Sequence, residues 1–118
     1  MRILIVDDNQ VMRNIVKRSL HQGFDNLQII EAFDGKDALE KFKSAELDLI
    51  LSDWNMPNLD GLALLKAIRM ENPDVLFGFI TAQNSSTLRK SAKIYGAHFL
   101  LSKPFAPEML TAKIQELL

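Results

Sequence analysis

The sequence of 118 residues contains no cysteine. This absence excludes disulfides, thiolate zinc sites, iron–sulfur clusters and a cysteine nucleophile, and it gives no support for secretion. An excess of charge of either sign is also missing, because 14 Lys and Arg stand against 15 Asp and Glu and leave a formal net charge of -1. The chain therefore has no overall electrostatic attraction to nucleic acid or to an anionic membrane, and we expect neither as a partner.

Long apolar runs are absent as well. Runs such as 3–6 and 75–80 are far below the ~20 residues that span a bilayer, and the first directly follows Met1-Arg2. We therefore expect a cytoplasmic protein. The length favours one compact domain over residues 1–118, and 47% hydrophobic with 25% charged residues is a mix that can bury a core.

Apolar segments with strand character alternate with segments of helical periodicity along the chain. Strands are predicted at 3–6, 27–32, 47–52, 75–81 and 98–102. Helices are predicted from Met12 to Leu20, after Asp34-Gly35, from Gly61 to before Pro73, from Ser86 to Tyr95, and along Met109, Leu110, Ile114 and Leu117. The fourth helix ends at Gly96, in the position of a C-cap. Because this helix has the thinnest apolar face, we expect it to be the least stable.

Strict alternation of strand and helix with short connections predicts an α/β fold, a parallel sheet covered by helices on both faces. Right-handed crossovers leave few strand orders, of which the flavodoxin-like, doubly wound order 2-1-3-4-5 fits five such units. In an open sheet of this kind, ligands bind outside the carboxyl ends of the strands where the order reverses. Here that point lies between the first and third strands.

Five polar residues stand at the carboxyl ends of the predicted strands: Asp7, Asp8, Asp53, Thr81 and Lys103. A single Asp after a strand is usually a turn or a helix cap, but the coincidence of five at one edge indicates a site. Three carboxylates crowded together repel each other unless a cation joins them. Because all the ligands are oxygens and no His is near, Mg²⁺ or Mn²⁺ is favoured over zinc or copper.

The same set suits a phosphoryl group. The ammonium of Lys103 and the hydroxyl of Thr81 supply the further cation and donor that a phosphoryl group needs beside the metal. A carboxylate next to that metal can attack phosphorus and form an acyl phosphate.

Four segments, in fixed order and spacing, connect the chain to a known family: Val6-Asp7-Asp8 with Met12-Arg13 and Ile15-Val16, Ser52 to Asn58 with Asp60-Gly61, Thr81-Ala82, and Lys103-Pro104-Phe105. In these segments, and over its full length, the sequence resembles response-regulator receiver domains, those of chemotaxis regulators most of all. The resemblance implies a switch phosphorylated by a sensor histidine kinase, which then acts on a downstream target protein or effector domain. It also implies that the domain catalyses only its own phosphorylation and dephosphorylation.

The resemblance further assigns roles to individual residues. Asp53 is the implied phosphoacceptor, and Asp8, Asp53 and the backbone carbonyl of Asn55 are the implied Mg²⁺ ligands, with Asp7 acting through a water. Thr81 is implied to hydrogen-bond the phosphoryl group and Lys103 to pair with it. A cis peptide is implied between Lys103 and Pro104. Partners are implied to dock on the face made by the fourth helix, fifth strand and fifth helix.

Two positions depart from the family pattern. Leu100 stands three residues before the lysine, where Tyr or Phe is usual, and Phe99 must point to the opposite face of the strand. Gln83 follows Thr81 by two residues, where an acidic residue is frequent. We therefore expect activation to be transmitted mainly by Thr81 and the loop into the fourth helix, with the fifth strand changing little.

Several interpretations stay open from the sequence. An Asp-nucleophile phosphatase of the haloacid dehalogenase type needs an Asp-x-Asp pattern and a longer chain. A flavodoxin-like mononucleotide-binding module needs a phosphate loop rich in hydroxyls and glycine after the first strand. Trp54 fits either the rim of the crevice or a packing role. Two sets of cations are equally consistent with docking patches and with solvated helix faces: Arg13, Lys17 and Arg18, and Arg89, Lys90 and Lys93.

Overall fold

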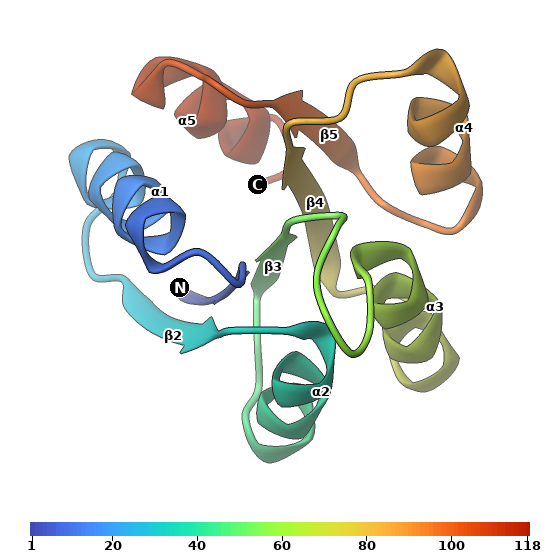
Figure 1. Ribbon diagram of the computed structural model, residues 1–118. Helices are drawn as coiled ribbons and strands as arrows, with labels where there is room; N and C mark the ends of the chain where they lie inside the picture. The colour runs from blue at the N-terminus through green and yellow to red at the C-terminus, as the bar shows by residue number, and fades with distance from the viewer.

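A computed structural model describes residues 1–118 as five strands and five helices in strict alternation (Figure 1). The elements are β1 (Arg2–Val6), α1 (Gln10–Gly23), β2 (Gln28–Ala32), α2 (Gly35–Ser44), β3 (Leu49–Ser52), α3 (Gly61–Glu71), β4 (Leu76–Thr81), α4 (Ser86–Ile94), β5 (Phe99–Ser102) and α5 (Pro107–Gln115). The strands form one sheet in the order β2-β1-β3-β4-β5, and every neighbouring pair is parallel. The predicted α/β class and strand order are confirmed.

The differences from the predicted elements lie at their ends and on one helix face. Helix α1 continues past Leu20 to Gly23, in a polar last turn that apolar periodicity cannot detect. The apolar face predicted for the last helix is wrong at Met109, whose exposure is 52%, because Leu110 and Ile114 alone are buried there. No helix has the length and apolar character that crossing a membrane requires.

The helices cover both faces of the sheet and bury an apolar cluster on each. Helices α1 and α5 pack together on one face, whereas α2, α3 and α4 contribute to the cluster on the other (Figure 1). Successive residues of one strand enter opposite clusters, as Leu4 and Ile5 do. The central strands are therefore apolar on both faces, which explains why they are continuous apolar runs in the sequence.

Local capping sets where the helices begin, and so where the loops at the carboxyl edge end. Four helices start after a side chain that accepts a backbone N–H three residues on, and the four caps are Asn9, Asp34, Asp60 and Ser85. Helix α4 ends at Ile94, one residue before the predicted Tyr95, and Gly96 follows its cap with a φ of 100° and donates its N–H to the carbonyl of Lys93. Of the residues of α4, only Ala92 is buried.

Gly61 opens α3 and lies directly against the strand that carries Asp53. A Cβ at this position would overlap with the backbone oxygen of Asp53 and lie 3.0 Å from the Cα of Trp54. These neighbours are backbone atoms at the start of the loop that precedes α3, so they cannot move aside as a side chain can. A glycine is therefore required by close packing.

We expect Gly61→Ala to lower the free energy of unfolding by about 1–3 kcal/mol, since overpacking a tight contact costs that much. Urea denaturation followed by circular dichroism measures the change. The control is Ser86→Ala, at the exposed first position of α4, which should stay within about 0.5 kcal/mol of the parent. Equal stability of the parent and Gly61→Ala would contradict the close contact.

Candidate functional site

Three carboxylates meet at the carboxyl edge of the two central strands. Asp7 and Asp8 follow β1, and Asp53 follows β3, its neighbour in the sheet. One oxygen of each lies within 4.8 Å of the others; Asp7 is buried, Asp53 half-buried and Asp8 exposed. The structure thus brings the three predicted carboxylates together at the point where the strand order reverses.

Lys103 is the cation inside this cluster. Its Nζ lies 2.9 Å from Oδ2 of Asp7 and 3.2 Å from Oδ2 of Asp53, and its side chain is 15% exposed. Burial lowers the pKa of Lys103, but the hydrogen bonds and negative charges of Asp7 and Asp53 outweigh it, so that the pKa is raised above its ordinary value. The ammonium is therefore held in its charged form between two carboxylates.

The carboxylates differ in how many of their oxygens are already bonded. Asp7 accepts the N–H of Asn9 at 2.9 Å on Oδ1, with Lys103 on Oδ2. Asp53 accepts the N–H of Trp54 at 2.7 Å on Oδ1, with Lys103 on Oδ2. Asp8 accepts no hydrogen bond from the chain and faces solvent, so its oxygens are open to a cation that arrives from outside.

Two further predicted site residues lie at the same edge without touching the carboxylates. Thr81 ends β4 and is buried; its hydroxyl accepts the N–H of Gln83 at 3.2 Å, and its carbonyl accepts the N–H of Lys103 at 2.9 Å. Asn55 is exposed in the loop between β3 and α3, two residues after Asp53. Lys103 is joined to Pro104 by a cis peptide, as the resemblance implies.

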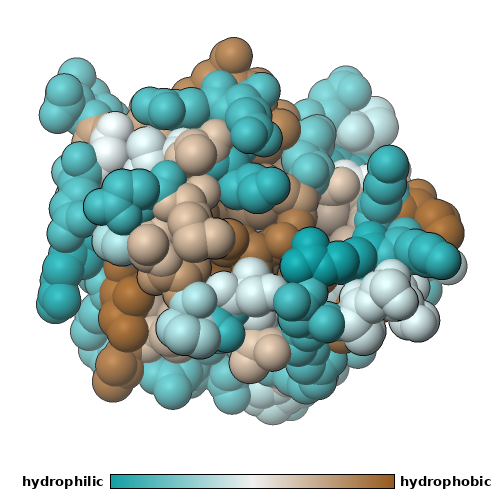
Figure 2. Space-filling view, turned by 90° about the horizontal axis from the view of Figure 1, so that it is seen from above, coloured by the Kyte–Doolittle hydropathy of each residue, from teal (hydrophilic) through white to brown (hydrophobic).

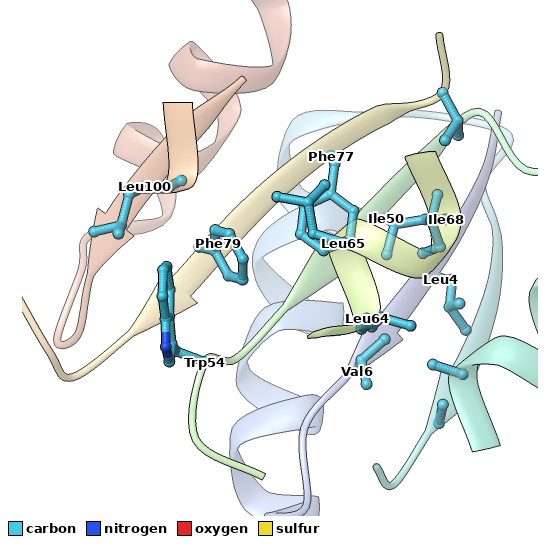
Figure 3. Packing of buried hydrophobic residues seen from close by; sticks show 14 residues of the cluster. Leu4, Val6, Ile50, Trp54, Leu64, Leu65, Ile68, Phe77, Phe79 and Leu100 are labelled. Carbon is cyan, nitrogen blue, oxygen red and sulfur yellow. The ribbon is translucent and has the colours of Figure 1, made fainter. Parts of the chain in front are cut away.

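Trp54 is a packing residue rather than an exposed one. It is 6% exposed, and its ring lies 4.6 Å from that of Phe79. Leu100 pairs with Phe79 in the sheet and lies in the same cluster (Figure 3), which also includes Ala92 of α4. Phe99 packs against the cluster on the opposite face, as its position next to Leu100 predicts.

Arg13 has a role near the site that the sequence analysis did not identify. Its Nη1 donates to the carbonyl of Asp7 at 2.7 Å, and its Nε lies 3.1 Å from Oε1 of Glu31, which also binds Lys17 at 3.0 Å. The hydrogen bond from Lys17 and the one from Arg13 outweigh burial and lower the pKa of Glu31. Two of the three cations considered as a docking patch on α1 are therefore paired within the fold.

Comparison with known proteins agrees with this geometry. The profile of the response regulator receiver domain matches residues 3–115. The chain is 33% identical to chemotaxis protein CheY1 of Helicobacter pylori, covering 100% of this chain and 97% of that protein. It is 37% identical to response regulator MprA of Mycobacterium avium, of which it spans 51%. The structure of chemotaxis protein CheY4 of Vibrio cholerae superposes with a TM-score of 0.90 at 34% identity, covering 99% of this chain and 98% of that one.

The raised pKa of Lys103 predicts how the stability of the metal-free protein depends on pH. Because the folded state binds this proton more tightly, the stabilisation is fully present below the unfolded pKa of 10.5 and is lost as pH rises through the higher folded value. We expect the difference in unfolding free energy between the parent and Lys103→Met to shrink above that pH. Urea denaturation in EDTA at neutral and alkaline pH measures it, and a constant difference would contradict the ion pair.

Proposed function

The chain belongs to the response regulator receiver domain family, and from this premise we propose that residues 1–118 form one phosphorylation switch with Asp53 as the phosphoacceptor. The observation that supports this is the cluster of Asp7, Asp8 and Asp53 with Lys103 between two of them. The family is one of signalling switches rather than of enzymes with a separate substrate. The phosphatase and mononucleotide-binding alternatives have no comparable support.

The donor set fits Mg²⁺. Receiver domains bind this ion at an acidic cluster, and the carboxylates here offer hard oxygens at mutual distances within 4.8 Å. Asp8, Asp53 and the backbone carbonyl of Asn55 would hold it directly. Asp7, which is buried whereas Asp53 is half-buried and Asp8 exposed, would act through a water. When bound, Mg²⁺ neutralises the carboxylates and the oxygens of the incoming phosphoryl group.

The proposed reaction is transfer of a phosphoryl group from a phosphohistidine of a sensor histidine kinase. An oxygen of Asp53 attacks phosphorus, the P–O bond forms, and the P–N bond breaks with its electron pair going to the imidazole, which takes up a proton. The Lys103 ammonium then pairs with the new dianion, and the Thr81 hydroxyl rotates to donate to it. Hydrolysis of the acyl phosphate returns Asp53 to its carboxylate and releases phosphate.

The proposed readout is the face made by α4, β5 and α5. Helix α4 buries only Ala92 and packs Leu88 against the core in part, so that a modest free energy can shift it. Seen from above the view of Figure 1, where these elements lie, the surface is largely hydrophilic with hydrophobic residues in several separate places (Figure 2). Such a surface suits a regulated, reversible partner better than a permanent one.

The partners proposed are a sensor histidine kinase and a downstream target, in the cytoplasm. Likeness to the chemotaxis proteins CheY1 and CheY4 supports chemotaxis as the first pathway to test. The chain spans about half the length of two other relatives, MprA and the transcriptional regulatory protein TrcR of Mycobacterium tuberculosis, at 51% and 45%. These two support the alternative of a receiver attached to an effector domain.

Acetyl phosphate should label the protein on Asp53, and only when Mg²⁺ is present, because the carboxylates otherwise repel the donor. Intact mass spectrometry measures the added phosphoryl group. Asp53→Asn should abolish the label, whereas Asp60→Asn, which keeps a good helix cap, should be labelled like the parent. Equal labelling of Asp53→Asn and the parent would show that another residue is the acceptor.

The position of Leu100 predicts where activation is visible. A leucine offers neither the hydroxyl nor the flat surface of an aromatic residue that moves between exposed and buried positions. With beryllofluoride as a mimic of the phosphoryl group, we expect amide hydrogen exchange to change between Thr81 and Tyr95 and to change little from Phe99 to Ser102. Comparable changes in β5 would show that the strand switches without an aromatic ring.

A further inference from the structure

The loop between β3 and α3, residues 53–60, is held near its tip by a contact with the turn before α2. The side-chain amide of Asn58 donates to Oδ2 of Asp34 at 2.6 Å. Within the loop, Leu59 donates to Pro57 and Gly61 closes the base by donating to Trp54, both at 2.7 Å. The backbone N–H groups of Asn55, Met56 and Asn58 donate to no group of the chain. The bond to Asp34 is therefore the one hydrogen bond that ties the middle of this loop to another element.

The carboxylate of Asp34 is held in place and is a strong acceptor for that bond. Asp34 is 3% exposed, and its other oxygen accepts the N–H of Asp37 at 2.7 Å as the cap of α2. The N–H of Asp37 and the amide of Asn58 outweigh burial and lower the pKa of Asp34, so the buried carboxylate stays charged and its hydrogen bonds are charge-assisted. Asp34 makes no ion pair, so its charge is stabilised by the N–H of Asp37 in the turn and the amide of Asn58 in the loop.

Asn58 contributes a defined backbone conformation as well as the amide. Its φ is 68°, in the left-handed region that asparagine tolerates better than most residues. Next to it, the loop lies against the first residue of α2, since a Cβ on Gly35 would overlap with the backbone oxygen of Leu59. Two neighbouring points of the loop are thus fixed to the same turn.

We propose that Asp34 and Asn58 are positioning residues for the metal ligand that Asn55 provides through its backbone carbonyl. The inference rests on the proposed function, which makes that carbonyl a ligand. A carboxylate can adjust through its rotamer, whereas a carbonyl lies wherever the backbone of its loop places it. Because Asn58 is three residues from Asn55, the bond that fixes the loop at Asp34 limits the positions open to that carbonyl. Neither positioning residue touches the ion.

The test compares two substitutions at left-handed asparagines. Asn58→Gly removes the amide while glycine keeps the positive φ without strain. The matched control is Asn26→Gly, at the chain's other asparagine with positive φ, 57°, in the turn between α1 and β2. Mg²⁺ is titrated into each metal-free protein and followed by Trp54 fluorescence and by calorimetry. Because Asn58→Gly loses one hydrogen bond that positions the carbonyl, its Kd for Mg²⁺ should rise about five-fold. The Kd of Asn26→Gly should not change.

A double substitution that exchanges the hydrogen-bond donor and acceptor should restore Mg²⁺ binding. Asn58→Asp alone opposes two carboxylates and should weaken Mg²⁺ binding, whereas Asp34→Asn/Asn58→Asp restores a bond of reversed direction and keeps an Asn cap on α2. The double variant should bind Mg²⁺ within about two-fold of the parent, since the restored bond offsets most of the loss. Amide exchange without metal should be faster in residues 55–59 of Asn58→Gly alone.

Parent-like Mg²⁺ affinity in Asn58→Gly, equal weakening in Asn26→Gly, or no rescue by the exchange would each overturn the positioning role. A failure of the proposed function gives a different result, because then the parent itself binds no Mg²⁺ in the same titration. That outcome would remove the metal site first and the positioning role with it. Faster loop exchange with unchanged affinity would show that the bond stabilises the loop without serving the ligand.

Discussion

Like charge held at one edge of a parallel sheet is the constraint on which the site depends. The backbones of Asp7 and Asp53 are fixed, because their N–H groups are bonded to the carbonyls of Ala32 and Val6 in neighbouring strands, and only side-chain rotation can separate the two carboxylates. Their repulsion must therefore be met by a cation, and in this structure Lys103 meets it from the end of β5. Asp53 and β5 are separated by β4, so the lysine side chain reaches across the end of that strand. Thr81, short and buried at the end of β4, leaves it the path.

Features that depend on short stretches of sequence were predictable. Contacts between elements that are distant in the sequence were not. The strands, the cap at Gly96 and the edge that gathers Asp7, Asp53 and Lys103 follow from apolar runs, turn residues and the rule for parallel sheets. The pairing of Arg13 with Glu31 depends on how α1 lies across β2, and the bond of Asn58 to Asp34 joins residues 24 apart. Trp54 stayed open because its burial depends on Phe79, which comes from another strand.

The packing around Trp54 connects the acidic edge to the least anchored helix. Trp54 follows Asp53 directly, lies against Phe79, and shares its cluster with Leu100 and with Ala92 of α4 (Figure 3). Leucine at position 100 fills this space with a buried aliphatic group. In the proposed switch, this cluster is the route from Asp53 to α4, because the arrangement of close-packed apolar side chains is sensitive to small changes of volume.

The parts of the site differ in how they can respond to added negative charge. The sheet fixes the backbones of Asp7 and Asp53, so in the proposed switch a phosphoryl group on Asp53 adds charge next to carboxylates that can separate only by side-chain rotation. The repulsion is then relieved by groups that can rotate or move. In the proposed switch, the Lys103 ammonium moves from Asp7 to the dianion, and the Thr81 hydroxyl gives up the N–H of Gln83 and donates to a phosphoryl oxygen. Helix α4, in which only Ala92 is buried, then shifts. The proposed switch therefore combines strands that hold the acids in place with a helix that few buried contacts hold.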